Sequence, residues 1–199
     1  MKLETRLAQP RDLAQIKRLI DANISRDFYS IEDLESMVHG EDDLLYVVAD
    51  ADRDGMIVSY FYAFLSTLDE ALQVLHVQEK PEALQKYAGN ERVGGYKTTS
   101  TDPAYRKLGL FSSFMANLQP VLKNRGASMI VATALRPFGQ EIPIRHVLMK
   151  TGFVPILTLH SPWAGTKGYC PYCRQDACIC DAVLYIREFS GEGDEKHGG

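Results

Sequence analysis

Two short stretches of the chain hold most of the residues that could do chemistry. In the first, Thr98 to Phe111, a β-rich run of small hydroxyl residues ends at Asp102-Pro103, and Arg106 to Gly109 then leads into a helical pattern. A strand, a tight turn and a helix N-terminus favour anion binding, because the first N–H groups of a helix lack partners and the dipole is positive there. Phosphate groups fit such a site without a deep pocket.

The second stretch holds all four cysteines, as a Cys-x-x-Cys pair (Cys170, Cys173) and a Cys-x-Cys pair (Cys178, Cys180). Cys-x-x-Cys is a common half of a zinc site, since the turn lets two sulfurs reach one metal. Four thiolates make a closed tetrahedral site, so the clustering predicts a structural zinc. A redox pair at Cys170 and Cys173, disulfides or free thiols, and an iron–sulfur cluster stay open as alternatives.

The totals describe an ordinary globular chain. Its 199 residues suit one domain, 45% are hydrophobic and 24% charged, and the formal charge is −4. The mild negative charge argues against nucleic acid as the main partner, because phosphate backbones require clustered Lys and Arg. No apolar run is long enough to cross a bilayer, and the first residues lack the apolar segment of a secretion signal. We therefore expect a cytoplasmic location and no membrane partner.

Apolar periodicity places the elements of the first half. A strand over 3–8 precedes a helix that opens at Pro10, and a second helix begins at Ser30, with Asp33 completing a capping box, and ends at Gly40. Apolar runs over 44–49 and 56–65 flank a polar turn and predict a hairpin. The segment 66–92 is longer than a hairpin needs, and we interpret it as an insertion that covers part of the active site, with a packed connector as the alternative. Within it, Pro81 at a first turn predicts a helix over 81–87.

In the second half, strands and helices alternate. We expect a strand over 94–101, a helix over 108–124 that Pro120 bends or breaks, and a strand over 128–134. A helix over 142–150 and strands over 153–159 and 182–186 follow. Residues 1–190 thus make a single domain with a Cys-rich loop at 164–181, and the polar, glycine-rich end at 191–199 predicts a disordered tail.

Two short motifs of the chain also resemble motifs of a known protein family. Arg106-Lys107-Leu108-Gly109-Leu110-Phe111, after Asp102-Pro103-Ala104-Tyr105, resembles the acetyl-CoA signature of the GNAT N-acetyltransferases, and Lys150-Thr151-Gly152-Phe153 resembles the end of their last helix. Phe111 departs from the signature, which usually has Gly or Ala there. The resemblance implies a mixed α/β fold, with a central twisted sheet of about seven strands flanked by helices and splayed between strands 4 and 5.

The resemblance also implies where acetyl-CoA would bind. In the family the pantetheine arm lies between the splayed strands, in a gap that a bulge in the fourth strand opens. Backbone groups of the fourth strand and amides of the following turn hold the cofactor, and a strand N–H stabilises the oxyanion. The corresponding residues here are Thr99, Ser100, Thr101, Arg106, Lys107, Leu108, Gly109, Leu110 and Phe111.

The proton carriers are less clear from the residues. The family's usual donor is a Tyr four residues before the Gly of Gly-Phe, and here that position is Leu148, which cannot donate. Glu91, Tyr96 and His146 are the candidates nearby, and a water-mediated route with no dedicated base is the alternative.

The resemblance implies an acyl-CoA N-acyltransferase that acetylates a primary amine by direct attack in a ternary complex. A small molecule or an amino acid is the favoured acceptor, with a peptide N-terminus, a lysine side chain or an antibiotic still open. A non-catalytic acyl-CoA-binding protein or a metal-stabilised interaction module is the rival from another class, and the replacement of Tyr by Leu148 is its best support. A homodimer is one of the assemblies left open.

Overall fold

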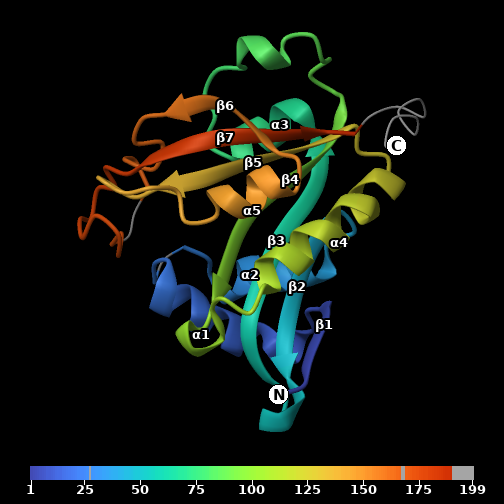
Figure 1. Ribbon diagram of the computed structural model, residues 1–199, viewed down its shortest axis with the longest axis vertical. Helices are drawn as coiled ribbons and strands as arrows, with labels where there is room; N and C mark the ends of the chain where they lie inside the picture. The colour runs from blue at the N-terminus through green and yellow to red at the C-terminus, as the bar shows by residue number, and fades with distance from the viewer. Residues whose placement is uncertain (27, 167–168, 190–199) are drawn as a thin grey trace.

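A seven-stranded mixed sheet runs through the molecule in the order β1-β2-β3-β4-β5-β7-β6 (Figure 1). The computed structural model describes residues 1–26, 28–166 and 169–189, so the predicted tail at 191–199 lies outside the described residues. All neighbouring strands are antiparallel except β4 and β5, which are parallel. The strands are β1 (Leu3–Leu7), β2 (Asp43–Asp50), β3 (Met56–Thr67), β4 (Arg92–Thr101), β5 (Met129–Arg136), β6 (Val154–Leu159) and β7 (Asp181–Glu188).

Helices cover both faces of the sheet. In Figure 1 α4 and α5 lie in front of the strands, while α1, α2 and α3 lie behind them. The helices are α1 (Leu13–Asn23), α2 (Ile31–His39), α3 (Leu68–Val74), α4 (Leu110–Asn124) and α5 (Arg145–Lys150), with short 3-10 turns at η1 (Pro10–Asp12), η2 (Ala51–Arg53), η3 (Glu82–Leu84) and η4 (Pro103–Tyr105). This arrangement confirms the predicted fold class. None of these helices combines the length and apolar character needed to cross a membrane.

Local signals place several of these elements. The capping box at α2 forms as predicted: the Asp33 N–H donates to Ser30 Oγ at 3.0 Å, and the Ser30 N–H donates to the Asp33 carboxylate at 2.8 Å. A second box, of Thr67 with Glu70, starts α3 at the end of β3. These bonds satisfy helix N–H groups that would otherwise lack partners.

Three expectations differ from the structure. The helix α4 continues through Pro120 without a break, because packing of its apolar side against the sheet outweighs one lost hydrogen bond. The helix predicted over 142–150 begins only at Arg145, since Pro143 disfavours helical backbone at the preceding residue. In place of the helix predicted over 81–87, the structure has only the three-residue turn η3.

Each face of the sheet has its own core. Behind the sheet, side chains of α1, α2 and α3 pack on alternate residues of the strands, including Tyr60 and Val131. In front, α4 and α5 pack on the other set, including Phe61 and Ala132. Successive side chains along β3 and β5 point to opposite faces of the sheet, so the position of a residue in the strand decides in which core its side chain packs.

Candidate functional site

A bulge in β4 opens the sheet. In the β3–β4 ladder Tyr62 pairs with Thr98 and Ala63 with Tyr96, so Lys97 is one residue more than β3 can pair. The parallel ladder from β4 to β5 ends at Tyr96 paired with Ala132. Beyond that point the two strands diverge (Figure 1), and the rest of β4 makes no ladder pairs with β5. The splay predicted between these strands is confirmed.

The turn after β4 presents free backbone donors. Lys107 and Gly109 both have left-handed backbone, with φ of 64° and 76°. Gly109 is the N-cap of α4 and no side chain caps this helix, so its first N–H groups keep their capacity to bind an anion. A Cβ on Gly109 would meet nothing within 4 Å, so the glycine is required for its backbone conformation and the space in front of it is open.

Hydrogen bonds from three elements hold this turn. The Arg106 guanidinium donates to the Thr101 carbonyl at 3.1 Å and to Asn23 Oδ1, at the end of α1, at 2.9 Å. The Tyr105 hydroxyl donates to the buried Asp50 carboxylate at 2.6 Å. The backbone N–H groups of the turn are therefore held in place before any ligand arrives, as an anion site requires.

The side chains of the predicted cofactor residues on β4 mostly tie the strand to its neighbours. Thr99 Oγ1 donates to the Tyr60 carbonyl at 2.8 Å, Ser100 Oγ donates to the Leu19 carbonyl at 3.3 Å, and Thr101 Oγ1 lies 2.7 Å from Ser59 Oγ. A ligand bound between the diverging strands β4 and β5 would therefore meet backbone groups of these residues.

Phe111, the departure from the signature, directs its ring away from the anion site. The ring stacks on Phe61, with centroids 6.4 Å apart, and lies 5.5 Å from the Tyr96 ring. A large side chain is tolerated here because it packs in the core and leaves the Phe111 N–H at the start of α4.

Four hydroxyls around the bulge are buried without a hydrogen-bond partner among the described residues. Those of Tyr29, Tyr60 and Thr98 gather on the α1–α2 side, and that of Tyr96 lies on the α4 side. Burial raises the pKa of all three tyrosines, so each stays protonated at neutral pH. Buried polar groups are normally satisfied, so these hydroxyls fit a site that receives a polar ligand.

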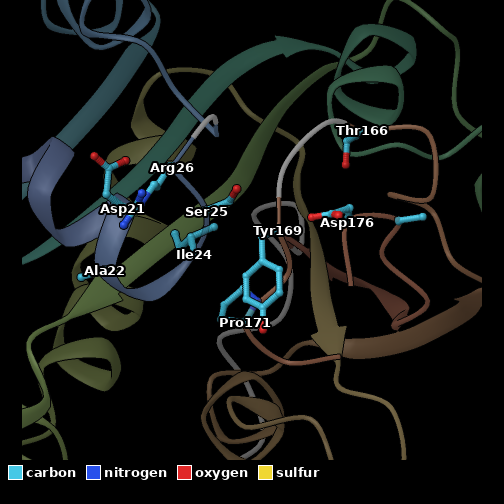
Figure 2. A pocket seen from close by; sticks show the side chains of 10 residues that line it. Asp21, Ala22, Ile24, Ser25, Arg26, Thr166, Tyr169, Pro171 and Asp176 are labelled. Atoms are coloured by element: carbon cyan, nitrogen blue, oxygen red, sulfur yellow. The ribbon is translucent and has the colours of Figure 1, made fainter. Parts of the chain in front are cut away.

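A cavity of about 830 Å³ lies between the end of α1 and the loop joining β6 to β7 (Figure 2). Asp21, Ile24 and Arg26 line it from the α1 side. The loop contributes Tyr169, Pro171 and Asp176, and the Asp176 carboxylate points toward the α1 side. The full lining of the cavity is Asp21, Ala22, Ile24, Ser25, Arg26, Thr166, Tyr169, Pro171, Asp176 and Ala177.

The four cysteines of this loop converge. Their Sγ atoms all lie within 4.8 Å of one another, and all four are free thiols. Cys170 pairs with Gln175 across a tight turn, in which the Arg174 N–H donates to the Cys170 carbonyl and Arg174 takes a φ of 59°. Cys178 and Cys180 are buried beneath this turn. A redox pair confined to Cys170 and Cys173 does not describe this arrangement.

The thiols of the cluster differ in how readily they ionise. Burial opposes ionisation of Cys173, but N–H groups of Ile179 and Gln175 and the neighbouring thiols lower its pKa to about 7. Burial raises the pKa of Cys178 and of Cys180, and for Cys180 it outweighs the opposing effect of the Phe138 N–H. A zinc ion about 2.3 Å from each sulfur needs sulfurs about 3.8 Å apart, so the cluster fits tetrahedral zinc with small adjustments.

Similarity to solved structures settles the fold. Arabidopsis thaliana NAA60 bound to a bisubstrate analogue matches with a TM-score of 0.70 at 13% identity, covering 95% of this chain and 100% of that one. An acetyltransferase of the GNAT family from Streptococcus pneumoniae matches at 0.61 and 13%, covering 94% and 100%. The chain has the GNAT fold.

Two further comparisons bear on this result. The ribosomal-protein-S18-alanine N-acetyltransferase from Escherichia coli matches the GNAT fold of this chain with a TM-score of 0.63 at 14% identity, covering 99% of this chain and 100% of that one. NAA60 has also been solved with acetyl-CoA. No protein-family model matches the chain, and no curated protein matches its sequence.

Within this GNAT fold the three predicted proton carriers lie apart. Tyr96 is adjacent to the bulge and 2% exposed. Glu91 precedes β4 and is six residues before Lys97, about 20 Å from the bulge at 3.3 Å per residue. His146 is exposed on α5, and Leu148 has an aliphatic side chain, which excludes it as a donor. The structure therefore brings only Tyr96 to the opening of the sheet.

Two basic side chains that the sequence analysis did not select lie on the α1–α2 side of the bulge. The Lys97 ammonium lies 5.5 Å from the centre of the Tyr29 ring, and burial lowers its pKa. His76 follows α3, is half-buried, and meets the Trp163 ring edge-on at 6.4 Å. Neither residue belongs to a short motif, and only the packing of α3 on the sheet brings them into one region.

Proposed function

We propose that this protein is an acetyl-CoA-dependent N-acetyltransferase that acetylates a primary amine by direct attack in a ternary complex. The observation that carries the proposal is the bulge at Lys97, where β4 leaves β5, followed by the uncapped helix N-terminus at Gly109. Together they offer an extended gap for a pantetheine arm and fixed donors for a pyrophosphate. Bound acetyl-CoA supplies the acetyl thioester.

The chain's own residues then have separate tasks. Backbone groups of Thr99, Ser100 and Thr101 border the gap, and the N–H groups from Lys107 to Phe111 surround the anion site. An N–H of the bulge stabilises the oxyanion that develops at the acyl carbon. Tyr96, protonated because burial raises its pKa, provides a proton for the leaving thiolate.

The cavity between α1 and the Cys-rich loop suits the acceptor. Its volume of about 830 Å³ accommodates a small molecule or an amino acid, and Asp176 directs a carboxylate into it. A carboxylate there attracts an ammonium group. Because this cavity and the bulge share the α1–α2 side of the sheet, an amine could reach the acyl group from this side while the phosphates stay at the α4 turn.

We also propose that Cys170, Cys173, Cys178 and Cys180 hold one structural zinc. The convergence of four sulfurs within 4.8 Å supports this, as does the fact that every cysteine of the chain serves the cluster. Four protein ligands leave no open position, so the metal would order the loop and take no part in the reaction. The ordered loop would then form one wall of the acceptor cavity.

A non-catalytic acyl-CoA-binding protein is the second candidate. The observation in its favour is Leu148, fully buried and aliphatic, at the place where the family resemblance leads us to look for a Tyr donor. This protein would bind CoA by the same turn without turnover.

One experiment separates these candidates. The purified protein is incubated with acetyl-CoA and a panel of primary amines: amino acids, small amines, aminoglycosides and a peptide with a free N-terminus. Release of CoA thiol and the mass of the product report transfer, while calorimetry reports acetyl-CoA binding. Transfer supports the enzyme. Binding without transfer to any amine would select the second candidate, and no binding would reject both.

A further inference from the structure

The segment 66–92 places a histidine on the acceptor side of the sheet. Leu68, Ala71 and Leu75 of this segment are buried in the core that α1 and α2 share. Directly after α3 the chain reverses at His76, whose φ of 60° is left-handed, and Val77 returns to the core. The reversal is fixed by the Val77 N–H, which donates to the Leu72 carbonyl at 2.8 Å.

The His76 ring has a neighbour in the loop that lines the acceptor cavity and another at the bulge. On one side it meets Trp163, which starts the loop that lines the cavity. Both the N–H and the hydroxyl of Thr166, a cavity residue, donate to the Trp163 carbonyl, at 3.0 and 2.8 Å. Lys97, the bulge residue, is near enough for its charge to act on the ring. His76 therefore contacts the loop that lines the cavity and lies within electrostatic range of the residue at the opening of the sheet.

The surroundings keep this imidazole neutral near pH 7. Burial first, and the Lys97 ammonium second, lower the pKa of His76 below 6.5. Among the described residues, the other charge in this arrangement is Asp33 of α2, which raises the pKa of Lys97. Trp163 contributes no charge. A neutral imidazole can accept a proton, whereas the Lys97 ammonium cannot while it remains charged.

We propose that His76 is the general base that takes the proton from the acceptor ammonium before it attacks at the bulge. The proposal rests on the acetyltransferase function above. One ring nitrogen of His76 takes a proton from R–NH₃⁺, and the freed lone pair forms the N–C bond. The C–S bond breaks, the thiolate is protonated, and the amide nitrogen releases its remaining extra proton to solvent. This assigns a chemical role to the segment 66–92.

The test compares His76→Gln with His39→Gln, a control at the exposed end of α2, in kcat/KM for the amine from pH 5 to pH 9 at saturating acetyl-CoA. The wild type and the control should lose activity in acid as a group with a pKa below 6.5 becomes protonated. His76→Gln should lower kcat/KM about 100-fold or more at pH 7 and remove this acid limb, since a general base contributes about 10²–10⁴-fold. Acetyl-CoA affinity should stay within about twofold.

Two results count against the inference and can be told apart. If the wild type transfers acetyl groups while His76→Gln keeps the wild-type rate and acid limb, His76 is not the base and the proposed function stands. If the wild type binds acetyl-CoA yet acetylates no amine, the proposed function fails and the inference fails with it. A variant that loses activity by unfolding is recognised by circular dichroism, and NMR titration of His76 in the wild type then decides: a pKa at or above 6.5 would overturn the role.

Discussion

Gly109 and Tyr96 are single residues on which the proposed chemistry depends. Gly109 gives the turn a left-handed residue at the helix N-cap. Tyr96 places a buried hydroxyl without a hydrogen-bond partner beside the bulge. Each is unfavourable for folding in its own way, one through backbone entropy and the other through desolvation. Features that oppose stability and gather at one place are typical of a binding site.

Gly109→Asp should weaken acetyl-CoA binding by at least about 30-fold, because a carboxylate would stand beside the pyrophosphate. Gly55→Asp is the matched control. Gly55 has a φ of 72° and open space around it, like Gly109, but lies in the β2–β3 turn. Calorimetry measures both. Equal acetyl-CoA affinities of the two folded variants would show that the turn at Gly109 is not part of the cofactor site.

Tyr96→Phe should lower activity without lowering the stability of the fold. Removing a buried hydroxyl that lacks a partner should leave the free energy of unfolding unchanged or raise it by about 1 kcal/mol. Loss of the proton donor should lower kcat about 10-fold or more. Chemical denaturation and steady-state rates report the two effects. Full activity in this variant would indicate that solvent, and not Tyr96, protonates the leaving thiolate.

At the scale of elements, the Cys-rich loop depends on its cluster for order. The loop between β6 and β7 is rich in exposed side chains, including Tyr169 and Tyr172, and has little apolar surface of its own to bury. The two buried thiols and the turn around Cys170 are its main tertiary anchors. A bound metal would therefore add its binding free energy to the order of this loop, while the two cores of the sheet fold without it.

Cys173→Ser should reduce bound zinc from one equivalent to below about a tenth, and raise KM for the amine about tenfold, because one cavity wall loosens. Acetyl-CoA affinity should change less than threefold. Tyr172→Phe keeps all four thiols and is the control. Elemental analysis of protein purified without chelator is the measurement. Zinc-free wild type with four titratable thiols would contradict the site, and iron with a visible absorption band would indicate a cluster.

At the scale of the whole molecule, the buried Asp12 and the half-buried His76 make stability depend on pH in separate windows. Burial opposes the charge of Asp12, but two hydrogen bonds from Arg6, at 2.6 and 2.9 Å, and one from the Gln9 N–H hold its pKa below 3.8. This stabilisation is complete above pH 3.8 and is lost as pH falls through the folded-state pKa. His76 also has a lowered pKa, so the unfolded chain binds its proton first, and stability falls as pH drops below 6.5.

Asp12→Asn should therefore lower the free energy of unfolding by about 2–3 kcal/mol at pH 7 and flatten its dependence on pH below 4. Arg6 would keep its charge without a carboxylate beside it. Glu4→Gln is the control, since its pair with Lys2, at 3.6 Å, is exposed and should contribute less than about 1 kcal/mol. Urea denaturation from pH 3 to pH 8 is the measurement. Equal effects of the two substitutions would contradict the assigned role of Asp12.

What the sequence determined by itself is local. The capping box of Ser30 and Asp33, the turn ending at Gly109 and the Cys170–Cys173 pair each involve residues within a few positions of one another. Backbone dihedrals and short-range hydrogen bonds decide such features, and residue types report them directly. The periodic apolar runs placed the strands for the same reason, because alternation records which face is buried.

Only the tertiary structure decided the bulge, the cavity and the neighbours of His76. The bulge depends on the register of β4 against β3. Lys97 is left without a partner on β3 only because Tyr62 pairs with Thr98 and Ala63 pairs with Tyr96. His76 and Trp163 meet across separate segments because α3 packs on the sheet, and no local pattern encodes that contact. His146 was one of three candidates from sequence because it lies near a motif, and the structure leaves it exposed on α5. Nearness along the chain fixes local geometry, whereas a site assembled from distant elements follows from how their apolar faces pack.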